Sequence, residues 1–177
     1  MEEIRQSLYR FFRELPLLLV SAVIIAFLLK AFVVQPFWIP TGSMIPTLMP
    51  NDRVLALKIV YRFTDPQPGD IVVFLPPNGE SKDYIKRVVA VGGQSIKIVD
   101  GKVFVNGKPL SEPYLSPEYC DSGTMKEIKI PEGYYFVMGD NRPNSLDSRV
   151  FGPIPRSAII GKAVVIYWPL DRIRLLR

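Results

Sequence analysis

Three stretches of this 177-residue chain carry side chains that could take part in catalysis, although the chain contains no histidine. The first is the turn at residues 40–46, PTGSMIP, which holds a single serine, Ser43. A serine in such a turn is usually structural. Here, however, Gly42 allows close backbone approach, the prolines stiffen the loop, and a backbone N–H together with the Thr41 hydroxyl could form an oxyanion hole. Ser43 is therefore a candidate nucleophile.

A nucleophilic serine needs a base, and without histidine a Ser-His-Asp triad is excluded. A lysine can act as the base only when its pKa falls from about 10.4 to near 7, which requires an apolar, desolvated site. Lys86 lies in the apolar strand-like run at residues 84–91. Alternation along a strand places Lys86 on one face with Val88 and Ala90, and Arg87 on the other. The alternative is an edge-strand lysine that protects against aggregation.

The third stretch is the polar loop at residues 139–149, GDNRPNSLDSR, which follows an apolar strand pattern. A loop of this length is long for a simple chain reversal. A solvated turn held by Asx motifs and an Asp-Arg pair is the structural alternative.

Histidine and cysteine usage argues against metal and disulfide chemistry. The chain lacks the commonest metal ligand, and its one cysteine, Cys120, can form neither an intramolecular disulfide nor a thiolate-rich zinc site. We therefore expect no metal and no cofactor, and we interpret Cys120 as an incidental thiol.

The elements that must position these side chains are short strands. Seventeen prolines and twelve glycines separate runs of Val, Ile, Tyr and Phe, so we expect a mainly β, antiparallel fold. The predicted strands lie at residues 54–60, 70–75, 84–91, 95–99, 102–105, 133–138 and 163–168. Hairpin turns are predicted at Asp100-Gly101 and Asn106-Gly107. The more polar residues 96–130 form an expected small inserted lobe, beside a catalytic domain at residues 35–95 and 131–177.

A membrane anchor is predicted before the domain. Residues 15–34 form an apolar run that would span about 30 Å as a helix, enough for one crossing. A cleaved signal peptide would be shorter and followed by a small-x-small site. Arg5, Arg10 and Arg13 predict that residues 1–14 are cytoplasmic and that the domain lies outside. Phe37 and Trp38 suit the membrane interface.

The net charge of +5 is scattered, without an aromatic-interleaved basic stripe, so nucleic-acid binding is not expected. The basic C-terminus at residues 171–177 is either a solvated tail or a contact for anionic lipid.

Taken together, these stretches resemble the bacterial type I signal peptidases, membrane-anchored serine proteases that remove signal peptides from exported proteins. The resemblance covers nearly the whole chain: the anchor and residues 40–48, 69–74, 83–88, 139–142 and 147–149, in that order. It implies the family's mainly antiparallel β fold, signal-peptide-bearing preproteins as substrates, and a location in the bacterial cytoplasmic membrane. We expect a monomer.

The resemblance also implies roles for individual residues. Ser43 would be the nucleophile and Lys86 the neutral general base, with Thr41 as the second oxyanion donor. Ser145 would hydrogen-bond and orient the Lys86 amine. The remaining matches are a supporting ion pair of Asp147 with Arg149, and pocket residues that imply cleavage after small side chains such as Ala-X-Ala: Phe37, Ile39, Asp83 and Ile85.

Two departures from the family pattern stand out. Pro143 occupies a position where relatives often carry Asp, and residues 96–130 are short for the family's variable lobe. Two other interpretations remain open at this point. One is a self-cleaving Ser-Lys protein related to the SOS-response repressors, against which the anchor and the lack of a helix-turn-helix pattern argue. The other is a non-catalytic, membrane-tethered β domain that binds exported proteins.

Overall fold

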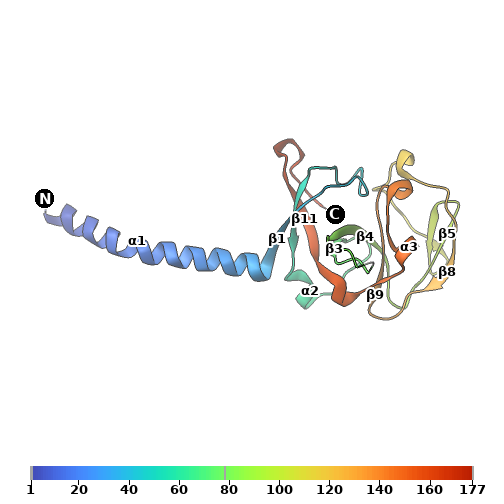
Figure 1. Ribbon diagram of the computed structural model, residues 1–177, viewed down its shortest axis with the longest axis horizontal. Coiled ribbons are helices and arrows are strands. Elements are labelled where there is room, and N and C mark those ends of the chain that lie inside the picture. Colours follow the sequence, from blue (N-terminus) through green and yellow to red (C-terminus); the bar gives the residue numbers. More distant parts are fainter. Residues whose placement is uncertain (1, 78, 177) are drawn as a thin grey trace.

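A long N-terminal helix leads into a domain of two antiparallel β-sheets (Figure 1). The computed structural model describes residues 2–77 and 79–176, so Met1, the first residue of the predicted cytoplasmic segment, lies outside the described residues. Helix α1, Glu2–Leu28, continues through a π-helical turn, Leu29–Val33, into strand β1, Val34–Trp38. The predicted helix at residues 15–34 is therefore wrong at its C-terminal end, because Val34 pairs with Leu57 of the larger sheet instead. Across residues 2–77 and 79–176, no helix combines the length and the apolar character that a membrane crossing requires.

Within the described residues, the larger sheet has the strand order β1-β2-β11-β3-β4-β9-β10, and β12 pairs with β11. All its pairings are antiparallel. The strands after β1 are β2 Arg53–Leu57, β3 Ile71–Phe74, β4 Tyr84–Val91, β9 Tyr134–Met138, β10 Ile154–Pro155, β11 Ile159–Trp168 and β12 Arg174–Leu175. The short helices are α2 Val60–Phe63 and α3 Ser148–Phe151, with 3-10 turns at Pro117–Tyr119, Arg142–Asn144, Arg156–Ala158 and Leu170–Arg172.

The smaller sheet has the order β7-β6-β5-β8, formed by β5 Ser95–Val99, β6 Lys102–Val105, β7 Lys108–Pro109 and β8 Met125–Lys129. Its hairpins turn at Asp100-Gly101 and Asn106-Gly107, as predicted, and all four residues have positive φ. Such backbone angles match the right-handed twist of the strands. The mainly β, antiparallel fold class expected from the sequence is confirmed.

The predicted strand at residues 54–60 is wrong at its C-terminal end. Strand pairing stops at Leu57, which faces both Val34 and Lys162, and the chain then turns into helix α2. Tyr61 of α2 is buried against the larger sheet. Burial of this side chain, rather than strand propensity, decides the local conformation.

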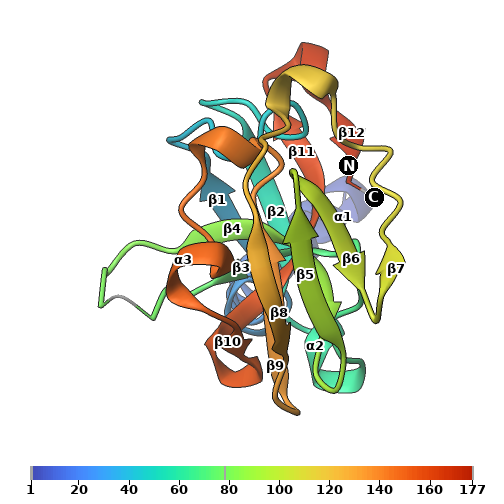
Figure 2. The same ribbon diagram turned by 90° about the vertical axis from the view of Figure 1, so that its right-hand side faces the viewer.

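The two sheets share a hydrophobic core. Figure 2 shows the smaller sheet in front of β9, and side chains from β4 and β9 pack with those of the smaller sheet. This cluster comprises Val89, Ala90, Phe136 and Met138 together with Ile96, Ile98, Val103 and Ile130. Ala90 was expected on the face of Lys86 and Val88. That expectation is wrong because the β4–β9 register shifts between Val88 and Ala90, which turns Ala90 into this core.

Phe136 is fully buried where the sheets meet. Phe136→Ala should lower the free energy of unfolding by about 3–5 kcal/mol, because it leaves a cavity between the sheets. Urea unfolding in detergent, followed by tryptophan fluorescence, measures this loss. Phe63→Ala is the matched control because Phe63 is 82% exposed, and its effect should stay within about 0.5 kcal/mol. Equal effects of the two variants would contradict a shared core.

Candidate active site

Ser43 lies in a turn that buried neighbours hold against the larger sheet. Met44 and Leu48 are fully buried in the core cluster that also contains Val54 and Ile166. The Leu48 amide donates to the Met44 carbonyl at 2.8 Å, and the Ile45 amide donates to the Gly42 carbonyl at 3.2 Å. Burial of Met44, the residue after Ser43, therefore fixes the turn.

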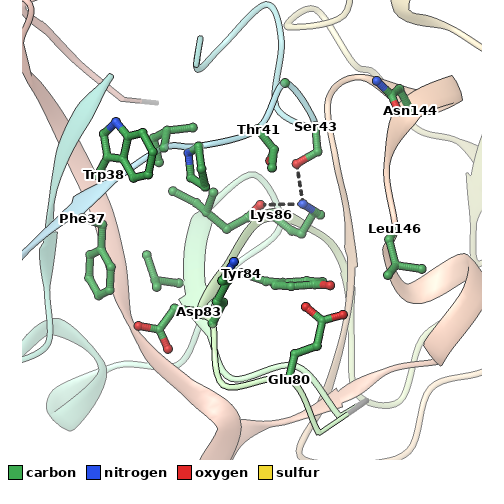
Figure 3. Close-up of a pocket in the computed structure, with 16 residues that line it drawn as sticks. Phe37, Trp38, Thr41, Ser43, Glu80, Asp83, Tyr84, Lys86, Asn144 and Leu146 are labelled. Atoms are coloured by element: carbon green, nitrogen blue, oxygen red, sulfur yellow. Dashed lines mark hydrogen bonds between the residues drawn. The ribbon is translucent and has the colours of Figure 1, made fainter. Parts of the chain in front are cut away.

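Strand β4 brings Lys86 to this serine, which lies 43 residues earlier in the chain. The Lys86 Nζ atom lies 2.6 Å from Ser43 Oγ and donates to the Ile85 carbonyl at 3.0 Å (Figure 3). Lys86 is only 4% exposed and pairs with Val72 of β3, so it does not belong to an edge strand. The edge-strand interpretation is therefore wrong.

Burial changes the acid–base behaviour of Lys86. Loss of solvent lowers the pKa of the Lys86 amine from 10.5 to about 8, since a low-polarity site disfavours the ammonium. The carboxylates of Asp147 and Asp140 act in the opposite direction and raise the pKa. The amine therefore has a substantial neutral fraction slightly above neutral pH.

The polar loop contacts the backbone of the serine turn. The Asn141 amide donates to the Ser43 carbonyl, and its side-chain Nδ2 donates to the Gly42 carbonyl, both at 3.0 Å. Gly139 lies so close that an added Cβ would come within 2.4 Å of the Ser43 carbonyl oxygen. Only glycine fits this approach. The sequence marked the loop as polar but offered no signal that Asn141 would hold the turn.

Asp147 organises the same loop from the inside. Its buried carboxylate accepts the Gly139 amide at 3.0 Å and caps the first turn of α3. Arg149 Nε lies 2.9 Å from Asp147 Oδ1. Arg149 also pairs, at 2.5 Å, with Asp121 of the segment between β7 and β8. The structure thus brings Asp147 and Arg149 together as an ion pair.

Ser145 departs from the expected arrangement. The predicted hydrogen bond between Ser145 and Lys86 is not formed, and the buried Ser145 hydroxyl has no hydrogen-bond partner among residues 2–77 and 79–176. Lys86 instead directs its amine at Ser43 and the Ile85 carbonyl. Ser145 packs over Gly139, where an added Cβ would lie 2.2 Å from its Oγ.

A second buried ion pair joins β4 to the polar loop. Arg87 is 1% exposed, and its Nε and Nη2 atoms donate to the two oxygens of Asp140 at 2.9 and 2.7 Å. The Thr47 hydroxyl donates to the same carboxylate, and Arg87 also donates to the Gly69 carbonyl. No local pattern in the sequence predicts this pair, since alternation along β4 says nothing about the partner of a buried arginine.

A cleft of about 450 Å³ opens beside Ser43 and Lys86. Every predicted pocket residue lines it, as does Thr41: Phe37, Ile39, Asp83 and Ile85. Burial raises the pKa of the Asp83 carboxyl. Figure 3 also shows residues that the sequence analysis did not single out as cleft lining: Trp38, Glu80, Tyr84, Asn144 and Leu146. The last two come from the polar loop, so the cleft lies between that loop and β1.

Comparison with known proteins finds similarity to signal peptidases. A family model described as signal peptidase, peptidase S26, matches residues 12–168. Probable signal peptidase I-2 of Synechocystis sp. is 41% identical, with 92% of this chain and 76% of that protein covered. Probable signal peptidase I-1 of the same organism is 42% identical, with 94% and 87% covered. The crystal structure of a signal peptidase I from Enterococcus faecalis V583 is 32% identical, covers 56% of this chain and 97% of that chain, and has a TM-score of 0.48.

The pKa of Lys86 can be tested without any substrate. Competitive labelling of lysines with an acylating reagent across pH 6–11, read by peptide mass spectrometry, should give Lys86 a midpoint near pH 8. The neutral amine reacts, so labelling rises with pH through the pKa. The Ser43→Ala variant opens the approach to the amine if the wild type labels too slowly. A midpoint above pH 10 would show that Lys86 is not desolvated.

Proposed function

The chain belongs to the signal peptidase family, peptidase S26, and is a serine endopeptidase of the signal peptidase I type. We propose that it removes signal peptides from exported preproteins with Ser43 as the nucleophile and Lys86 as the general base. The observation that carries this proposal is the 2.6 Å contact between Lys86 Nζ and Ser43 Oγ at a buried amine of lowered pKa. A nucleophile and its base within hydrogen-bond reach are the signature of this chemistry.

The proposed reaction has two steps. Neutral Lys86 takes the Ser43 proton as Oγ attacks the scissile carbonyl, and the Ser43 amide and the Thr41 hydroxyl stabilise the oxyanion. The C–N bond then breaks, Lys86 gives its proton to the leaving amine, and an acyl-enzyme remains. In the second step Lys86 takes a proton from water, the hydroxide attacks the ester, and Ser43 regains its proton as the signal peptide leaves.

The cleft supports cleavage after small side chains of the Ala-X-Ala type. Phe37, Ile39 and Ile85 contribute apolar side chains to its lining, and Asp83 contributes a carboxyl group. Ile39 is 2% exposed and packs into the core, so this part of the lining has little room to move. Large side chains at the positions next to the cut would clash with it.

The loop residues Asp147 and Arg149 are proposed to support the dyad rather than to react. Their ion pair and the contact of Asp147 with the Gly139 amide hold the loop against Ser43. We also propose that residues 35–95 and 131–177 form the catalytic domain and residues 96–130 the inserted lobe.

We propose that residues 15–34, made up of the C-terminal part of α1, the π-helical turn and Val34 of β1, anchor the enzyme in the bacterial cytoplasmic membrane by one crossing. The run is apolar, and α1 extends away from the domain in Figure 1 with Leu17, Leu18 and Phe27 exposed. The N-terminus would be cytoplasmic and the catalytic domain extracytoplasmic. Membrane confinement of enzyme and preprotein would raise their effective concentration.

Cleavage of a purified preprotein in detergent tests the dyad. Ser43→Ala and Lys86→Ala should each lower kcat by at least about a thousandfold. Lys86→Arg should be as inactive as Lys86→Ala, because a guanidinium stays charged. N-terminal sequencing of the product should show a cut after a small-x-small site.

Lys97→Ala is a matched control, since Lys97 lies on the smaller sheet, and it should cleave like the wild type. If the Ser43→Ala and Lys86→Ala variants cut as fast as the wild type, the dyad is wrong. If folded wild-type protein cuts nothing, a non-catalytic binding domain becomes the better interpretation.

Topology can be tested with the single exposed cysteine, Cys120. A membrane-impermeant maleimide should label Cys120 in intact cells or, for an outer-membrane-containing host, in spheroplasts. The double variant Cys120→Ser/Ser7→Cys moves the thiol to the N-terminal segment and should label only after lysis. The reverse pattern would invert the topology, and release of the protein by alkaline carbonate would argue against a membrane-spanning anchor.

A further inference from the structure

The two carboxylates that act on Lys86 are each paired with an arginine. Asp147 pairs with Arg149, and Asp140 pairs with Arg87. Both carboxylates favour the charged form of the Lys86 amine. The arginines offset this attraction as long as they stay in place, since opposite charges at contact distance screen each other's field. The positions of the two arginines therefore affect the balance between the charged and the neutral form of the Lys86 amine.

Each arginine also contacts the segment that connects β7 to β8, residues 110–124. Arg149 Nη1 lies 2.5 Å from Asp121 Oδ2. The Arg87 guanidinium lies 3.9 Å from the centre of the Tyr114 ring, a cation–π distance. Asp121 and Tyr114 belong neither to the polar loop nor to the serine turn.

A third contact ties the same segment to the polar loop. Glu112 pairs with Arg142 and accepts the Tyr114 hydroxyl at 2.8 Å. Arg142 Nε donates to the Gly139 carbonyl at 3.1 Å, and Arg149 donates to the Arg142 carbonyl at 2.7 Å. The contacts of Glu112 and Asp121 thus meet inside the loop that carries Asp147.

These interactions are shielded from solvent. The side chains of Arg142 and Glu112 are 2% and 11% exposed, and those of Arg149 and Asp121 are 16% and 23% exposed. Pairs of this kind are screened much less by salt than surface pairs. Between β7 and β8 the described chain forms a single 3-10 turn, so the segment's place depends on such contacts rather than on sheet pairing.

We propose that Glu112, Tyr114 and Asp121 form a clamp that positions Arg142, Arg87 and Arg149 around the catalytic loop. They are positioning residues for the reaction of Ser43 and Lys86, and this inference rests on the proposed function. The clamp assigns a role to the small lobe: it supports the charge balance of the dyad without touching the substrate cleft.

The direction of the effect distinguishes the clamp from a simple charge change. Lys86 faces Asp147, Asp140, the Ser43 hydroxyl and the Tyr84 ring, and Asp121 is not among the groups that shift its pKa. Removing the Asp121 charge alone would favour the neutral amine, if it acted at all. Releasing Arg149 does the opposite, because Asp147 is then less screened and stabilises the ammonium.

The test is the acidic limb of the pH profile of kcat/KM for preprotein cleavage. In Asp121→Asn this limb should move to higher pH by about 0.5–1 unit, which is less than the pKa shift that a full charge next to the amine causes. Cleavage at pH 7 should then fall about three- to tenfold. Asp121→Glu, which restores the charge, should recover most of the wild-type limb. Glu118→Gln removes an exposed carboxylate of the same segment and should leave it unchanged.

A limb for Asp121→Asn that coincides with the wild type, or moves to lower pH, overturns the clamp. If thermal unfolding shows that Asp121→Asn is not folded, Tyr114→Leu and Tyr114→Phe are compared instead. Only Tyr114→Leu loses the ring over Arg87, so only this variant should move the acidic limb to higher pH. Equal limbs for both would overturn the proposal. If the wild type cleaves no preprotein, the proposed function fails, and the Lys86 labelling midpoint of the same variants still tests the clamp.

Discussion

The desolvation of one amine is the constraint on which the rest of this structure depends. Lowering the pKa of Lys86 from 10.5 to about 8 corresponds to about 3 kcal/mol against its ammonium form, and a flexible surface could not maintain that. The interior position of β4 in the larger sheet supplies the burial, and the Ile85 carbonyl and Ser43 Oγ receive the amine. The sheet and the serine turn together hold a desolvated amine beside a serine hydroxyl, in a chain that has no histidine.

A buried amine attracts nearby carboxylates, and the structure balances them with arginines. Asp140 and Asp147 both lie where they favour the ammonium, yet both are needed to hold the polar loop and the serine turn. Pairing with Arg87 and Arg149 lets the carboxylates keep this structural role while their field at Lys86 is reduced. The same two ion pairs therefore fix the position of the polar loop and limit the negative charge around Lys86.

The two sheets contribute differently to the site. The larger sheet carries Lys86 and lines the cleft, whereas the smaller sheet shares the core around Phe136 and contacts the polar loop through the segment between β7 and β8. The cleft itself lies between β1 and the polar loop.

Local chemistry in the sequence determined much of this protein: the short antiparallel strands, the two hairpin turns at Asp-Gly and Asn-Gly, and Ser43 and Lys86 as candidates. Those features depend on residues close together in the chain, such as the positive φ that Asp100 and Asn106 tolerate. Only the tertiary structure decided the bulge that buries Ala90 and the helix in place of a strand end at Val60. It also left the Ser145 hydroxyl without a hydrogen-bond partner among residues 2–77 and 79–176. It also decided the partners of Arg87 and Arg149, because the energy of a buried ion pair comes from segments far apart in the sequence, which no local pattern brings together.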